Sequence, residues 1–242
     1  MQQLRLTDLV PRRNSALFAL FLGGVAIVGG LEWLHTCQTR LAPLTTDGHV
    51  AAFDLDGEGS LAVWFSTATL ELAALTALLA WAIRRRTPAS RGQNALLIAA
   101  ACWLVMSIDE CASVHEAFKE LMAHSTGHRL LGDGTIWWVM GYGLVLSAVG
   151  LRLLWEFRRS WDAAGWLLAT AAVYALAVVA ELEWIIPNKG QTSVMLEEGC
   201  EMIGNLCLLL SMVCHARWAV KRAELSANGS LHTVRGVVRN AA

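Results

Sequence analysis

The stretch from residue 61 to residue 86 reads LAVWFSTATLELAALTALLAWAIRRR. One charged side chain, Glu71, interrupts the apolar run, which then ends in three consecutive arginines. A helix of about 20 apolar residues spans the hydrocarbon core of a bilayer, and Lys and Arg gather on its cytoplasmic side. The stretch therefore predicts a membrane-spanning helix that runs from the outer to the inner side.

Apolar runs of similar length recur along the whole chain of 242 residues, of which 55% are hydrophobic and 16% charged. A soluble domain carries about 25% charged residues. Backbone polar groups in lipid must be satisfied within each segment, so the spans are expected to be helices. We predict an all-α fold, a six-span transmembrane helix bundle over residues 1–222 with a polar cytoplasmic tail at 223–242. The predicted spans are about 15–35, 61–83, 95–118, 135–155, 163–186 and 194–216.

The distribution of Lys and Arg orients this bundle. With six spans, fifteen of the nineteen basic residues fall on one side and four on the other, a strong positive-inside pattern. Both termini are therefore predicted to be cytoplasmic. The basic residues of the inner side are Arg5, Arg12, Arg13, Arg84, Arg85, Arg86, Arg91, Arg152, Arg158, Arg159, Arg217, Lys221, Arg222, Arg235 and Arg239, and those of the outer side are Arg40, Lys119, Arg129 and Lys189.

Ionisable side chains inside the spans indicate where function lies, because charges are costly in lipid and mark functional sites. With the predicted orientation, the acidic residues of the spans and the histidines of the first and third spans fall in the outer half of the bilayer or at its outer interface. The candidate site residues are Glu32, His35, Glu71, Asp109, Glu110, His115, Glu116, Glu198 and Glu201. In a continuous third helix, Asp109 and Glu116 share a face and His115 points nearly opposite to Asp109.

Carboxylates combined with imidazoles are typical ligands of Fe, Mn or Zn. Glu32 and His35 form a Glu-x-x-His element, which recurs in carboxylate-bridged di-iron bundles. Glu198 and Glu201 have the same spacing but lack the histidine. We therefore predict a site for a divalent transition metal or another cation, either in a membrane metalloenzyme or in a metal-binding accessory protein.

Two motifs resemble those of a group of bacterial multi-pass membrane proteins without an assigned activity. They are DECASVHE at residues 109–116 and EEGCE at residues 197–201. The resemblance covers about two helices and implies a multi-span bacterial membrane protein, for which we expect the inner (cytoplasmic) membrane. It implies no reaction.

Two other functions fit the same pattern. Carboxylates within spans can relay protons or cations in a transporter, although no inverted repeat or broken helix supports this reading. An accessory subunit of a larger membrane complex is the other alternative. The expected partners are the lipid bilayer and a metal ion, not nucleic acid, and the sequence does not set the oligomeric state.

Overall fold

A computed structural model describes residues 6–46, 48–85, 94–130, 132–187 and 190–240 of the chain. Four of the basic residues used to orient the bundle (Arg5, Arg86, Arg91 and Lys189) lie outside these ranges. In the described part, all regular elements are helices. In chain order they are η1 (Leu6–Leu9), α1 (Asn14–Leu41), η2 (Ala42–Leu44), η3 (Ala51–Phe53), α2 (Leu61–Arg85), α3 (Asn94–Ala112), α4 (Val114–Thr126), α5 (Ile136–Phe157), α6 (Trp161–Glu181) and α7 (Gln191–Asn240).

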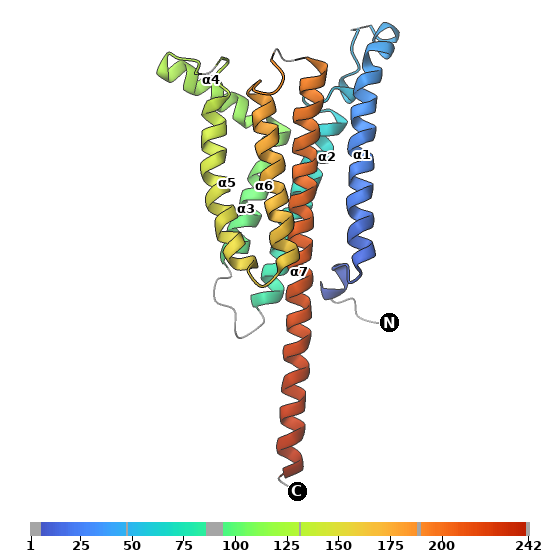
Figure 1. Ribbon diagram of the computed structural model, residues 1–242, viewed down its shortest axis with the longest axis vertical. Coiled ribbons are helices and arrows are strands. Elements are labelled where there is room, and N and C mark those ends of the chain that lie inside the picture. Colours follow the sequence, from blue (N-terminus) through green and yellow to red (C-terminus); the bar gives the residue numbers. More distant parts are fainter. Residues whose placement is uncertain (1–5, 47, 86–93, 131, 188–189, 241–242) are drawn as a thin grey trace.

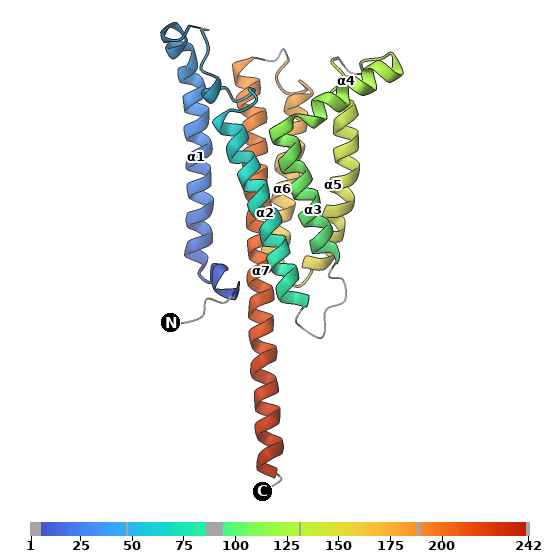
Figure 2. The same cartoon turned by 180° about the vertical axis from the view of Figure 1, so that it is seen from behind.

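Six of these helices are long and apolar enough to cross a membrane, as the sequence predicted. They are α1, α2, α3, α5, α6 and the first part of α7. α7 lies at the centre of the bundle, where it packs against α6, α2 and α1 (Figures 1 and 2). α2 packs against α3, and α5 contacts α3, α4 and α6. α7 also continues as a helix through the predicted tail, beyond the bundle (Figure 1).

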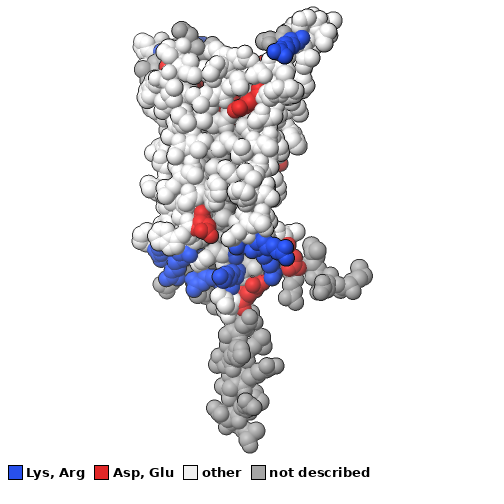
Figure 3. Space-filling model, turned by 45° about the vertical axis from the view of Figure 1, so that its right-hand side comes forward, with Lys and Arg blue, Asp and Glu red and all other residues white. Residues whose placement is uncertain are grey.

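The larger hydrophobic core joins α2, α3, α5, α6 and α7 and includes Leu70, Leu96, Phe157, Leu208 and Met212. The basic side chains gather in a belt at the end from which α7 leaves the bundle (Figure 3). The opposite end carries α4 and the polar loops (Figure 2). We call these the basic end and the polar end. Their separation agrees with the uneven distribution of Lys and Arg in the sequence.

A partly buried ionic contact lies at the basic end. Arg84 of α2 forms a salt bridge with Glu156 of α5. The same guanidinium lies 3.3 Å from His215 Nε2 of α7, and the His215 ring stacks on Phe157 at a centroid distance of 4.3 Å. Three helices that are far apart in the sequence are therefore held together below the apolar core.

The third predicted helix requires a correction. We expected one span over residues 95–118, but α3 ends at Ala112 and α4 begins at Val114. Ser113 between them has a φ of 48° and a ψ of 42°, the left-handed conformation. That conformation cannot continue a right-handed helix, so α4 leaves the end of α3 at an angle (Figure 2).

α4 exposes an apolar stripe at the polar end of the bundle. Val114, Phe118 and Leu121 are exposed, and their spacing places them on one side of the helix. A short amphipathic helix joined to the end of a transmembrane helix is typical of a segment lying at the membrane interface. We therefore expect this stripe to face lipid.

The left-handed Ser113 gives the first testable prediction. A β-branched residue is strained in this conformation, whereas glycine adopts it freely. Ser113→Val should be less stable than Ser113→Gly by about 1–2 kcal/mol, measured as thermal unfolding in detergent. Ala117→Val places the same side chain inside α4 and is the control, for which we expect a smaller loss. Equal stability of the two Ser113 variants would contradict the observed backbone.

Candidate functional site

Asp109 is the centre of the contacts at the polar end. It lies in the last turn of α3 and is 8% exposed. Its Oδ1 accepts a hydrogen bond from the backbone N–H of His115 at 2.6 Å, and its Oδ2 lies 3.2 Å from His115 Nδ1. The Tyr142 hydroxyl of α5 donates to the same Oδ2. One carboxylate therefore joins α3, α4 and α5.

His115 reaches Asp109 only because the helix breaks at Ser113. In an unbroken helix, the two side chains would have pointed in nearly opposite directions. The imidazole also packs against Trp138 at a centroid distance of 5.2 Å, and Trp138 meets Tyr142 edge-on at 5.7 Å. These aromatic contacts from α5 fix the ring of His115 over the carboxylate.

Three further carboxylates lie beside this group. Glu110 of α3 interacts electrostatically with Asp109 and lies next to the Ser66 hydroxyl of α2. Glu198 of α7 interacts electrostatically with both Glu201 and Glu110. Glu110 of α3 and Glu198 of α7 therefore interact electrostatically, and the grouping of the predicted residues around one ion stays a prediction.

A tyrosine from α6 completes the arrangement. The Tyr174 hydroxyl donates to Asn205 Oδ1 of α7 at 2.5 Å, and Tyr174 interacts electrostatically with Glu201 and Glu110. A Cβ at Gly204 would lie 2.5 Å from the Tyr174 ring, so glycine at this position allows the close approach. We call the whole set the outer polar cluster, after the side of the membrane on which the sequence predicts it: Asp109, Glu110, His115, Tyr142, Tyr174, Glu198, Glu201 and Asn205.

A second polar network, centred on Lys119 of α4, lies beside the cluster. Lys119 of α4 is buried and contacts Glu116 at 2.5 Å and Asp133 at 3.1 Å. Asp133 in turn accepts hydrogen bonds from the backbone N–H and hydroxyl of Thr135. The Thr135 hydroxyl lies 3.2 Å from Glu181 of α6. Candidate residue Glu116 therefore belongs to this network, with its carboxylate 3.9 Å from His115 Nε2.

The charged forms of Lys119 and Asp133 are stabilised by their partners in this network. Burial opposes the charge of Lys119, but its contacts with Glu116 and Asp133 outweigh burial and raise its pKa. Burial likewise opposes ionisation of Asp133, yet the hydrogen bonds from Thr135 and Lys119 lower its pKa to about 2. Lys119 therefore stays charged and paired with Glu116 and Asp133.

The Glu-x-x-His pair of α1 does not join the outer polar cluster. Glu32 lies against Gly199 of α7, where its carboxylate occupies the space that a Cβ would need. His35 turns to the loop that follows α1, where its Nδ1 accepts a hydrogen bond from the backbone N–H of Leu55 at 3.2 Å. Asp54 lies 3.7 Å from the same nitrogen, so the structure separates the two side chains.

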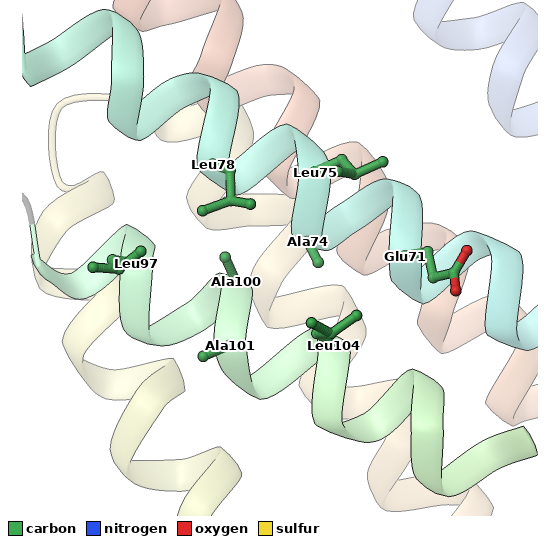
Figure 4. A pocket seen from close by; sticks show the side chains of 8 residues that line it. All are labelled: Glu71, Ala74, Leu75, Leu78, Leu97, Ala100, Ala101 and Leu104. Atoms are coloured by element: carbon green, nitrogen blue, oxygen red, sulfur yellow. The ribbon is translucent and has the colours of Figure 1, made fainter. Parts of the chain in front are cut away.

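Glu71 also lies outside the cluster. It is an exposed residue of α2, at one end of an apolar groove between α2 and α3 (Figure 4). Ser66, which contacts the cluster, lies five residues away and is buried on another side of the helix. Glu71 therefore faces outward from the bundle.

The predicted metal site is not preformed. Among the described residues, no three His, Cys, Asp or Glu side chains are grouped so that they could hold one metal ion. The carboxylates are neighbours, but they are not arranged as a ligand shell. Metal binding would therefore depend on rearrangement of the cluster side chains.

Sequence reasoning missed the tyrosines because it considered only side chains that ionise near neutral pH. A signal was present, since the chain has two tyrosines in all and both lie within spans. A hydroxyl that can donate to a carboxylate is expected to find a partner when buried. Asn205, at 2% exposed, could have been found by the same argument.

Comparison with known proteins shows that the chain belongs to a family of unknown function. The sequence model of a family described as "Domain of unknown function (DUF8692)" matches residues 12–216. This range contains all six candidate spans up to Ala216 and the whole outer polar cluster. No curated protein and no solved structure matches the chain.

The contact between His115 and Asp109 predicts a pH dependence of stability. Burial lowers the pKa of His115, but the hydrogen bond that its ring donates to Asp109 and the charges of Asp109, Glu116 and Glu201 outweigh burial, so that the pKa is raised. A raised pKa in the folded state stabilises the protein fully below the ordinary value of about 6.5. This stabilisation is lost as the pH rises through the raised value.

We therefore expect the difference in melting temperature between the native chain and His115→Gln to shrink as the pH rises above about 7. Thermal unfolding in detergent across the neutral and alkaline range measures it. His124→Gln changes an exposed histidine of the same helix and should leave the pH profile unchanged. A constant difference for His115→Gln at all pH values would contradict the assignment.

Proposed function

We propose that this chain, which belongs to the DUF8692 family, is an integral membrane protein that binds a cation in the outer polar cluster. The observation that carries the proposal is the electrostatic interaction between the carboxylates of Glu110 in α3 and Glu198 in α7. The charged groups that act most strongly on Glu198 are all carboxylates: Glu201, Glu110, Glu197 and Asp56. The buried lysine at this end is held by Glu116 and Asp133 instead.

Electrostatics require a compensating cation. An uncompensated charge in the middle of a membrane helix costs about 2.5–3.5 kcal/mol on insertion scales. Carboxylates that share one site cannot all remain ionised without a positive charge or a bound proton. The cluster side chains come from helices that are packed in the bundle. The free-energy cost of uncompensated carboxylate charge at this place therefore favours uptake of a cation.

Two kinds of cation fit the cluster. A divalent transition metal such as Fe, Mn or Zn is favoured by the chemistry of the donors, which are carboxylates and an imidazole. Protons are favoured by the absence of a preformed ligand group among the described residues, because paired carboxyls hold a proton without a fixed coordination geometry. The same side chains would bind either a divalent metal ion or protons.

Binding fits the architecture better than passage across the membrane. Beyond the cluster, the bundle packs an apolar core around Leu70, Leu96 and Met212. The salt bridge between Arg84 and Glu156 then closes the basic end. A proton- or cation-coupled transporter, the alternative that the sequence left open, would need both barriers to open.

Elemental analysis of the purified protein, combined with infrared spectra of the carboxyl groups at several pH values, tests the proposal. We expect either one equivalent of metal or a protonated-carboxyl band that changes with pH. Glu198→Gln and Asp109→Ala should diminish the signal that is found. Glu71→Gln removes a carboxylate within a span but outside the cluster, and should leave it unchanged. If the folded protein shows no bound metal and also no titrating carboxyl band, cation binding is refuted.

The proposal includes a location, with both termini in the cytoplasm and the polar end outside the inner (cytoplasmic) membrane. In a chain without its native cysteines, Glu120→Cys should react with a membrane-impermeant maleimide in intact bacterial cells whose outer membrane is permeable. Arg222→Cys should react only after the cells are lysed. Both native side chains are exposed, so the reverse pattern would indicate the opposite orientation.

A further inference from the structure

Glu71 is a carboxylate on the lipid-facing surface of a transmembrane helix. It lies ten residues after the start of α2, or about 15 Å along the helix axis, near the middle of a hydrocarbon core about 30 Å thick. It is exposed, and no other described residue forms a hydrogen bond or ion pair with it. Lipid chains have no group that could satisfy a carboxyl at this depth.

The surface around Glu71 is shaped to receive another helix. Figure 4 shows Glu71 at one end of the groove, on the same side as Leu104, with Leu78 and Leu97 at the other end. Ala74 of α2 and Ala100 and Ala101 of α3 line the groove, which has a volume of about 450 Å³. Small residues allow helix backbones to approach closely in membranes, and a polar residue beside them adds a hydrogen bond.

We propose that this groove is the interface between two copies of the chain, which meet through their α2 helices and hydrogen-bond through the two Glu71 carboxyls. Copies inserted with the same orientation are related by a twofold axis along the membrane normal. A residue on that axis meets its own counterpart at the same depth. A carboxyl that holds a proton has both a donor and an acceptor, so two Glu71 side chains complement each other.

The spacing of exposed residues along α2 agrees with this arrangement. Trp64, Glu71 and Leu78 are exposed and seven residues apart, and Leu75, which is 61% exposed, lies between the last two. Residues at this spacing lie on one face of the helix, the placement that the seam of two helices crossing at a shallow angle requires. The interface is on the surface of α2 and α3 and is independent of cation binding in the outer polar cluster.

Energy transfer between labelled full-length chains, reconstituted in liposomes at decreasing protein-to-lipid ratios, measures this association. The native chain should dimerise, and Glu71→Gln should retain dimerisation because an amide also donates and accepts. Glu71→Leu should weaken association by about threefold to tenfold, the range expected for one hydrogen bond between membrane helices. Ala101→Phe, which fills the groove, should weaken it independently of Glu71.

Leu151→Phe, at an exposed position of α5, is the matched control and should not change association. Thermal unfolding of each variant separates loss of the interface from loss of the fold. The proposal is wrong if the native chain remains monomeric at all densities, or if its dimer is unaffected by both Glu71→Leu and Ala101→Phe. A Glu71 contact found only with a different protein would also overturn it.

Discussion

The polar end of the bundle depends on a single carboxylate, that of Asp109. It accepts the backbone N–H of His115 in the first turn of α4, where a negative charge is also favoured by the helix dipole. The same carboxylate receives the Tyr142 hydroxyl from α5. Because these contacts come from three helices, the break at Ser113, the direction of α4 and the position of the imidazole are linked to one side chain.

The positive charge of Lys119 is paired with carboxylates that do not belong to the outer polar cluster. Its partners are Glu116 and Asp133, and the low pKa of Asp133 keeps that partner ionised. Lys119 therefore pairs with carboxylates outside the cluster, and the proposed cation binding depends on the acidic character of the cluster itself.

The sequence predicts most of the fold because the bilayer restricts length, hydropathy and basic residues together, as the run from Leu61 to Arg85 illustrates. It does not predict the break at Ser113, since serine has no strong preference for the left-handed conformation and the contact that stabilises the break is a tertiary one. Depth in the bilayer predicts that Asp109, Glu110, Glu198 and Glu201 lie at a similar level, as it does for Glu71, Glu32 and His35. It does not predict which of these residues become neighbours, because depth does not fix the direction in which a helix face points.

The two ends of the bundle solve the same electrostatic problem in opposite ways. At the basic end, Arg84 and Glu156 neutralise each other, and His215 is enclosed between Phe157 and Trp218. At the polar end, the described cluster contains four carboxylates and one imidazole. A buried pair that is already neutral gains little from a further ion, whereas an acidic group without a cation gains a great deal. The asymmetry supports a structural role for the basic end and the cation binding that we propose for the polar end.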